Sequence, residues 1–330
     1  MAETSYFWFE IISMAVLTAI LIADVLIIFK RPHIPSNRES TIWIVAYALL
    51  AVVFGGVLWQ LFGPDKATEF YAGWLTEYSL SIDNLFVFVI IMTRFSVPKK
   101  YQQEVLMVGV VLALILRGIF ILVGAALIES FSAIFYLFGA FLLYTAWHQA
   151  FRSHDDEEET ESKLILWLRK HIEVSKDFDG AKIRTKVNGK KMFTPMIVVF
   201  ITIAVTDVIF AFDSIPAIFG ITTSPFLVFA ANIFALMGLR QLYFLLGGLL
   251  DKLEYLKYGI AFILGFIGVK LVLHAMHENE LPFINGGQHI DWAPEISTVT
   301  SLLVIVASMA VATIASVVKM RSDEATSHTK

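Results

Sequence analysis

The sequence has 330 residues and a formal net charge of −4; 57% of its residues are hydrophobic and 16% are charged. Soluble domains carry about 25% charged residues. This composition and its repeated apolar runs therefore exclude a soluble α/β enzyme, a disordered chain and a nucleic-acid-binding chain. The sequence contains no cysteine, which excludes disulfides, thiolate catalysis and thiolate metal sites within it.

Nine apolar stretches are long enough to cross about 30 Å of hydrocarbon at about 1.5 Å per helical residue. In chain order they are residues 6–29, 41–63, 69–93, 105–128, 131–151, 194–219, 226–248, 257–276 and 298–318. The expected fold class is therefore all-α, a polytopic membrane protein with about nine transmembrane helices.

The positions of Lys and Arg predict the orientation of these spans, because cytoplasmic loops carry an excess of both. With the N-terminus outside, 21 of the 25 basic residues fall on the inner side, three lie within spans, and only Lys66 lies outside. Residues 1–10 show neither a basic segment nor a cleavage pattern, so they are interpreted as the start of an uncleaved span. We expect a multi-pass plasma-membrane protein with a cytoplasmic C-terminus.

Two longer segments are expected outside the bilayer. The inner loop 152–193 begins with an acidic run at 155–159 and contains Asn188-Gly189, a typical hairpin turn. The outer loop 277–297 carries acidic residues and histidines but no Lys or Arg. Either loop could attract cations weakly, although a solvated linker and a plain acidic loop are the simpler interpretations.

The third and sixth spans share a pattern of polar residues. The matched residues are Thr76, Glu77, Asp83 and Asn84 in the third span and Thr206, Asp207, Asp213 and Ser214 in the sixth, at an offset of 130. The span that follows each of them carries a central arginine, Arg117 or Arg240. Because the two units cross the membrane in opposite directions, they predict two inverted three-helix repeats, as in many secondary transporters.

These features divide the chain into six parts. They are the first two helices (1–68), the first repeat (69–151), the cytoplasmic loop (152–193), the second repeat (194–276), the extracytoplasmic loop (277–297), and the last helix with a cytoplasmic tail (298–330).

Carboxylates in hydrocarbon cost about 2.5–3.5 kcal/mol each on insertion scales, so the four acids of the two repeats need compensation. Arg117 and Arg240 are charge partners that would neutralise two of them, and a divalent cation or two protons would balance the rest. A static lattice of ion pairs alone leaves two negative charges. Asn84, Ser214 and Asn232 add neutral oxygens, and an oxygen-rich set suits Mn²⁺, Mg²⁺ or Ca²⁺.

Three neighbouring residues bear on this hypothesis. Pro216 is expected to free a carbonyl near Phe212, which is tolerable where it lines a cavity. Asn232 is equally well explained by a helix–helix hydrogen bond. Asp24, in the first span, is a weaker candidate that would serve as an anchor near the inner surface. The spans show no catalytic arrangement, so we expect no enzyme activity and no tightly bound cofactor.

Three segments resemble signatures of the TerC family of integral membrane proteins. They are Glu77 to Asn84, Thr206 to Pro216, and Asn232 to Tyr243, and the similarity covers about residues 10–275. The family is named for tellurium resistance, and several members act as manganese exporters in which intramembrane acidic residues matter. It is grouped with LysE-type exporters built from inverted repeats, and a plant relative assists membrane-protein insertion.

The resemblance implies export of a divalent cation, most of all Mn²⁺. The electrical cost of moving that cation out of an inside-negative cell predicts an antiporter that exchanges it for protons. The implied metal-site residues are Glu77, Asp83, Asn84, Asp207, Asp213 and Asn232. The expected partners are the cation, protons and the lipid bilayer, with no nucleic acid and with protein partners unknown. The alternatives are a membrane scaffold or assembly factor that uses the 152–193 loop, and tellurite-stress resistance without direct metal transport.

Overall fold

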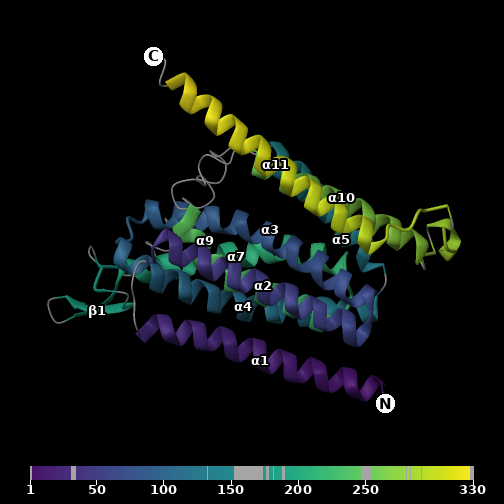
Figure 1. Cartoon of the computed structure of the whole chain (residues 1–330), viewed down its shortest axis with the longest axis horizontal. Coiled ribbons are helices and arrows are strands. Elements are labelled where there is room, and N and C mark those ends of the chain that lie inside the picture. Colours follow the sequence, from purple (N-terminus) through teal and green to yellow (C-terminus); the bar gives the residue numbers. More distant parts are fainter. Residues whose placement is uncertain are drawn as a thin grey trace.

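The computed structural model describes most of the chain, and its helices dominate the fold (Figure 1). The described residues are 2–30, 35–131, 133–151, 174–175, 178–180, 182–187, 190–246, 255–279, 281–282, 284–290 and 292–327. The helices are α1 (Ala2–Lys30), α2 (Asn37–Phe62), α3 (Pro64–Arg94), α4 (Lys99–Ser130), α5 (Ile134–Phe151), α7 (Pro195–Phe219), α8 (Pro225–Met237), α9 (Leu239–Leu246), α10 (Leu256–His277) and α11 (Thr298–Ser327). The protein is therefore a polytopic, all-α membrane protein, as expected.

Local sequence explains where several helices begin. α3, α7 and α8 each start at a proline, whose fixed φ and missing amide hydrogen suit the first helical position. α2 follows Ser36, whose hydroxyl accepts a hydrogen bond from the Glu39 amide at 3.2 Å. This is the serine half of a capping box, with the glutamate three residues on.

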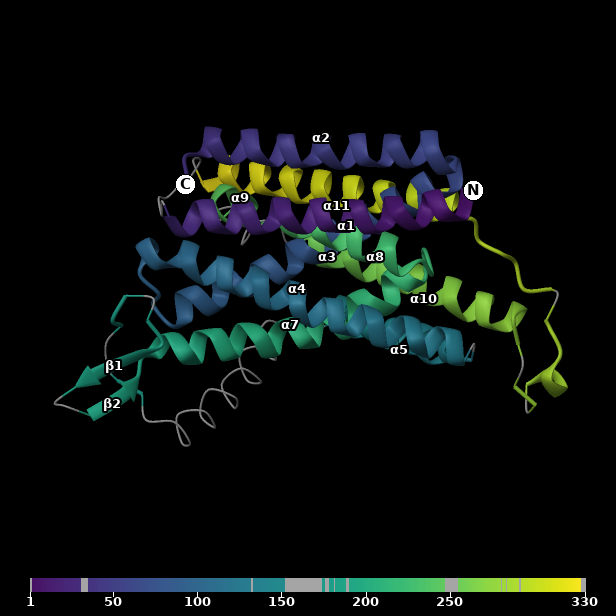
Figure 2. The same cartoon turned by 90° about the horizontal axis from the view of Figure 1, so that it is seen from below.

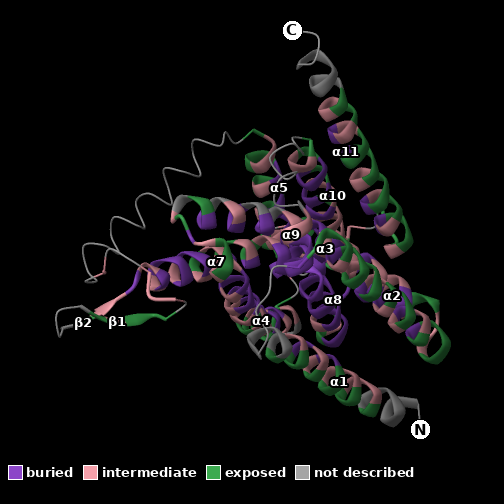
Figure 3. Cartoon of the chain, turned by 60° about the vertical axis from the view of Figure 1, so that its left-hand side comes forward, coloured by how far each residue is buried: buried purple, intermediate pink, exposed green. Residues whose placement is uncertain are grey.

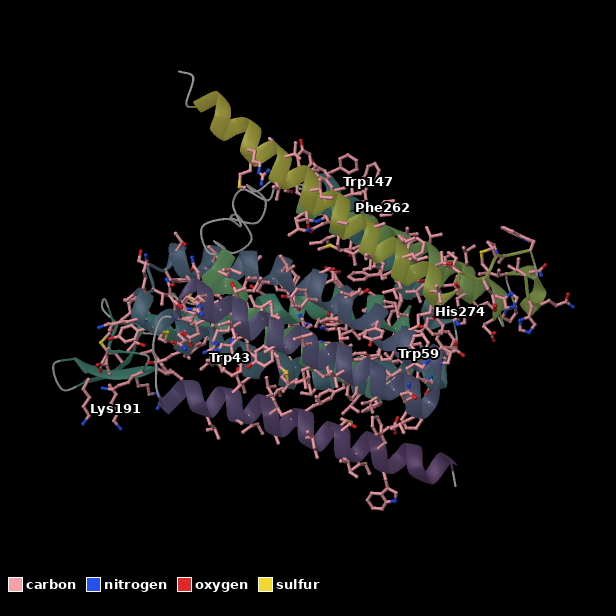
Figure 4. All side chains as sticks on the ribbon, viewed as in Figure 1. Trp43, Trp59, Trp147, Lys191, Phe262 and His274 are labelled. Atoms are coloured by element: carbon pink, nitrogen blue, oxygen red, sulfur yellow. The ribbon has the colours of Figure 1, made fainter. Side chains whose placement is uncertain are left out.

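α3 and α8 form the centre of the molecule, and α2 and α11 form its periphery. Most of α3 and nearly all of α8 are buried, whereas only a small share of α2 and α11 is (Figure 3). Trp147 of α5 and Phe262 of α10 are 69% and 60% exposed and point outward (Figure 4). Large exposed apolar side chains on these helices are what a lipid-facing surface requires.

The packing of the central helices matches what an inverted repeat would produce. α3 packs on α8, α4 packs on α7, and α5 and α10 make the most extensive contact (Figure 2). A two-fold axis that exchanges α3–α4–α5 with α7–α8–α10 turns the first of these contacts into the second and leaves the third unchanged. The repeats themselves stay a prediction, and this packing agrees with them.

Glycines allow α5 and α10 to approach closely. A Cβ added to Gly139 would lie 2.9 Å from the Gly268 carbonyl oxygen, and one added to Gly268 would lie 3.1 Å from that of Gly139. Small residues at such crossings let the backbones of membrane helices touch. This crossing joins the two predicted repeats.

Seven helical stretches of the described chain are long and apolar enough to cross a membrane. They correspond to all the predicted spans except 6–29 and 131–151, which form α1 and α5, so the count of nine stays a prediction. The span predicted at 226–248 is not one continuous helix, because it breaks at Gly238 between α8 and α9. Pro216, by contrast, lies inside α7, which continues to Phe219.

Much of the predicted inner loop 152–193 lies outside the described residues, including the acidic run 155–159, whereas the predicted outer loop 277–297 is described except for residues 280, 283 and 291. The predicted hairpin is confirmed: β1 (Arg184–Val187) pairs antiparallel with β2 (Lys190–Phe193), and Val187 lies opposite Lys190. In the segment predicted to lie outside, the short 3-10 helix η2 (Asn285–Gly287) follows α10, and His277 Nε2 lies 3.4 Å from Glu295 Oε1.

Candidate functional site

A buried ion pair lies at the middle of the helix bundle. Arg117 Nη1, on α4, donates to Glu77 Oε2, on α3, at 2.7 Å. Both side chains are almost fully buried, at 1% and 0% exposed. Glu77 is near the midpoint of α3 and Arg117 near that of α4, so the pair lies deep in the membrane-spanning region.

Three further side chains surround the guanidinium of Arg117 and the carboxylate of Glu77. Asp207 Oδ1, on α7, lies 3.7 Å from Arg117 Nη2. Asn232 Nδ2, on α8, donates to Glu77 Oε2 at 3.2 Å. Asn84, with its amide oxygen turned toward the guanidinium, accepts from Arg117 Nη2 at 2.6 Å. Helices α3, α4, α7 and α8 thus each contribute to one cluster, which we call the central site.

The central site leaves oxygen atoms without hydrogen-bond partners. Among the described residues, Glu77 Oε1, Asp207 Oδ2 and Asn232 Oδ1 are buried and unpartnered. Buried polar atoms are normally hydrogen-bonded, and each exception needs an explanation. The carboxylates of Glu77 and Asp207 and the guanidinium of Arg117 together leave a surplus of one negative charge. Three unpartnered oxygens beside this charge form an environment that suits a cation or a proton.

Two predicted ligands, Asp213 and Asp83, are not among the described side chains of the central site. Asp213, on α7, is half-buried and accepts a hydrogen bond from Thr145 Oγ1, on α5, at 3.0 Å. It follows Asp207 by six residues, about 240° around a helix, so the two carboxylates face different neighbours. The backbone of Asp83 is part of α3, but its side chain lies outside the described residues.

Arg240 lies apart from the central site, unlike its predicted counterpart Arg117. Its Nη2 is 4.0 Å from Asp24 Oδ1 on α1, and it donates to the Gln241 amide oxygen at 2.6 Å when that amide faces it. The Tyr47 side chain of α2 lies close enough to Asp24 to interact with it. Among the acids whose side chains are described, Arg240 therefore partners Asp24 and not Glu77, Asp207 or Asp213, because α1 and α2 supply its neighbours.

Sequence reasoning missed some of these partners. Thr145, Tyr47 and Gln241 bind the charged groups named above but were not among the predicted site residues. The available signal was a polar side chain within an apolar span, which was visible for Thr145. No three Asp, Glu or His side chains of the described residues lie close enough together to hold a metal ion. Among the described residues, the central site contains two carboxylates, those of Glu77 and Asp207.

Comparisons with known proteins agree with this picture. Over 309 residues the chain is 44% identical to an uncharacterized membrane protein of Mycobacterium tuberculosis, covering 92% of this chain and 78% of that protein. It is 38% identical over 259 residues to an uncharacterized membrane protein of Myxococcus xanthus, covering 78% and 81% of the two chains. It is 39% identical over 269 residues to "Putative membrane-bound redox modulator Alx" of Escherichia coli, covering 78% and 84%.

No solved structure matches the chain. The family described as "Integral membrane protein TerC family" matches residues 62–324, which include every residue of the central site. The chain therefore belongs to the TerC family of integral membrane proteins.

Proposed function

We propose that the chain is a secondary transporter that exports a divalent metal cation, Mn²⁺ before others, in exchange for protons at the central site. The observation that carries this proposal is the set of three buried, unpartnered oxygens on Glu77, Asp207 and Asn232, found among the described residues. The ligands are all oxygens, which suits Mn²⁺ and other hard divalent ions. The choice of Mn²⁺ and the outward direction follow from the family resemblance.

Arg117 gives the central site a way to remain stable when no cation is bound. Its guanidinium bonds Glu77 and lies beside Asp207, so it offsets part of the charge of both carboxylates. A divalent cation that binds these carboxylates would displace Arg117 or share them with it. Protons would neutralise the same groups on the return step, so cation and protons compete for one set of oxygens.

Proton coupling follows from the electrical work of export. Moving one charge against 100 mV costs about 2.3 kcal/mol, so a divalent cation leaving an inside-negative cell costs about 4.6 kcal/mol. Two protons that enter for each cation cancel this electrical cost. Any inward proton gradient then drives export.

Asp213 supplies a second carboxylate between α5 and α7. Among the described residues its hydrogen-bond partner is Thr145, and no arginine or lysine forms an ion pair with it. In this proposal Asp213 is a station on the cation or proton path and not a direct neighbour of Arg117. Asp83 keeps its predicted ligand role on α3.

The test is the manganese content of cells that lack their own exporter and are challenged with Mn²⁺. Elemental analysis would compare the empty vector, the wild-type chain, Asp207→Asn, and Asp179→Asn at equal membrane levels. Asp179 is a matched control because it forms an exposed ion pair with Lys182 near the hairpin. We expect lower manganese with the wild type and with Asp179→Asn, and no reduction with Asp207→Asn.

Other outcomes would point to other functions. Unchanged manganese with well-folded wild-type protein would contradict the export proposal and favour another cation or the scaffold role. Equal export by Asp207→Asn and wild type would place the ion site elsewhere. The relative named as a redox modulator suggests a redox test as well, but thiol exchange is not open to a sequence without cysteine.

A further inference from the structure

We propose that the hairpin β1–β2 is a binding surface for the acidic headgroups of phospholipids in the adjacent leaflet. The hairpin lies immediately before a membrane helix, since β2 ends at Phe193 and α7 begins at Pro195. The Thr194 amide, between them, donates to the Ile183 carbonyl at 3.0 Å. Figures 1 and 2 both place the hairpin at one end of the bundle, beyond the end of α7.

The strand register gathers basic side chains on one face of the hairpin. Lys186 lies directly opposite Lys191, and Arg184 lies opposite Phe193. Opposed residues of an antiparallel pair share a face, and so do residues two apart along a strand. Arg184, Lys186 and Lys191 therefore share one face, all three are exposed, and Lys191 points away from the helices in Figure 4.

The Lys186–Lys191 pair is unfavourable for the hairpin by itself. Like charges directly opposite each other on a sheet destabilise the pairing. The described acid near the hairpin, Asp179, contacts Lys182 and Thr185, not this pair. An external anion that bridges the two ammonium groups would turn the repulsion into attraction.

Phospholipid headgroups fit this surface better than a dispersed anion. Basic clusters next to a membrane helix attract acidic lipids, because the headgroups are concentrated at the surface where the cluster lies. Arg184 Cζ lies over the Phe193 ring, 4.8 Å from its centroid. This stacking leaves the edge of the guanidinium able to donate hydrogen bonds to a phosphate. The charge distribution of the loops puts the hairpin on the cytoplasmic side, where acidic lipids face it.

The test uses the full-length protein in nanodiscs, with one fluorophore on the hairpin. The chain has no cysteine, so Ile183→Cys, at an exposed position, gives a single attachment point. Energy transfer from this label is measured to headgroup-labelled phosphatidylglycerol and, separately, to headgroup-labelled phosphatidylcholine. Two charge variants are compared on this background: Lys186→Gln with Lys191→Gln, and Lys99→Gln with Lys100→Gln as a matched pair.

We expect phosphatidylglycerol to be enriched over phosphatidylcholine around the hairpin. Each lysine at an anionic surface contributes about fivefold to such a preference, so the hairpin variant should lose most of the enrichment. The Lys99 and Lys100 variant removes the same charge from an exposed pair at the start of α4, and it should keep the phosphatidylglycerol enrichment around the hairpin. Both charge pairs are exposed, and neutralising Lys186 and Lys191 removes a repulsion from the hairpin, so neither variant should impair folding.

Three results would overturn the proposal. The first is equal energy transfer to both lipids in the wild type. The second is an equal loss of enrichment in both charge variants, which would make the effect one of net charge alone. The third is enrichment of phosphatidylglycerol that appears only after residues 155–159 are neutralised by Asp→Asn and Glu→Gln changes. That result would mean that the acidic run of the chain itself, and not lipid, occupies the basic face of the hairpin.

Discussion

Glu77 and Arg117 show how costly a charged group is when its partner is removed. Both are buried, and Arg117 Nη1 donates to Glu77 Oε2 at 2.7 Å. Breaking a buried pair by removing one partner costs about 3–5 kcal/mol, because the other charge stays uncompensated. We expect Arg117→Gln, which leaves the Glu77 and Asp207 carboxylates without their cation, to lower the free energy of unfolding by about that amount, measured by thermal unfolding in detergent.

The exposed pair of Asp179 and Lys182 provides the control for this measurement. Its atoms lie 3.4 Å apart, but both side chains face solvent. Exposed ion pairs contribute about 0–1 kcal/mol, so Asp179→Asn should leave the unfolding temperature nearly unchanged. Equal destabilisation by the two substitutions would mean that the central site is hydrated and not buried.

The shape of Arg117, as well as its charge, matters at the central site. Nη1 bonds Glu77, while Nη2 faces both Asn84 and Asp207. Lysine keeps the charge but offers one nitrogen in place of the fork. Losing one charge-assisted hydrogen bond lowers an equilibrium constant about tenfold or more. We therefore expect Arg117→Lys to reduce Mn²⁺ export by at least that factor.

Arg240→Lys is the matched substitution for this experiment. Arg240 contacts Asp24 and Gln241 at the α1 side of α9, away from Glu77 and Asp207. We therefore expect Arg240→Lys to retain export when both variants are compared at equal membrane levels. If instead Arg240→Lys lost export and Arg117→Lys kept it, the central site would be misplaced.

At the scale of helices, the crossing of α5 and α10 depends on the absence of side chains. A Cβ on Gly139 would lie 2.6 Å from Val272 Cγ2 and 2.9 Å from the Gly268 carbonyl oxygen. The backbone oxygen cannot move aside as a flexible side chain would. Overpacking of this kind costs about 1–3 kcal/mol, so Gly139→Ala should destabilise the protein by that amount.

Gly56 of α2 offers the same substitution without a clash, since a Cβ there would meet nothing within 4 Å. Gly56→Ala should be neutral or slightly stabilising, because alanine is the better helix former. Heating each variant in detergent and measuring the monodisperse fraction by size-exclusion chromatography compares the two. A loss with Gly56→Ala equal to that with Gly139→Ala would contradict the close crossing.

Helices were predictable from the sequence where their apolar runs were long, and less so where tertiary contacts decide the geometry. The stretches 41–63 and 257–276 differ from α2 and α10 by a few residues at each end. The break at Gly238 was missed because glycine is tolerated inside an apolar run and gives no definite stop signal. Its effect is to place Arg240 on a separate short helix, beside α1.

The central site was predictable in part, for a similar reason. The repeated motif predicted Glu77 and Asp207, and the structure brings them to one arginine with Asn84 and Asn232. The motif treats Arg117 and Arg240 as equivalent, but only the second has α1 and α2 as neighbours. Helices outside a repeat break its symmetry, and the repeated sequence contains no information about them.

At the scale of the whole molecule, two segments lie at opposite ends of the bundle. The hairpin β1–β2 precedes α7, and the segment with η2 follows α10 (Figure 1). Between them lie three stretches, α7, α8 with α9, and α10, each long and apolar enough to span a membrane, so three crossings are expected. An odd number of crossings puts the hairpin and the η2 segment on opposite sides of the membrane, whichever way the protein is inserted.

The distribution of Lys and Arg predicts which of the two segments is cytoplasmic, and chemical labelling in cells measures this directly. Ile183, beside the hairpin, and Trp292, in the η2 segment, are 43% and 75% exposed, and the sequence has no cysteine to interfere. A membrane-impermeant maleimide should label Trp292→Cys in intact cells, and should label Ile183→Cys only after permeabilisation. The reverse pattern would invert the topology, and with it the direction of export and the leaflet that the basic hairpin faces. Labelling of both positions in intact cells would contradict three crossings between them.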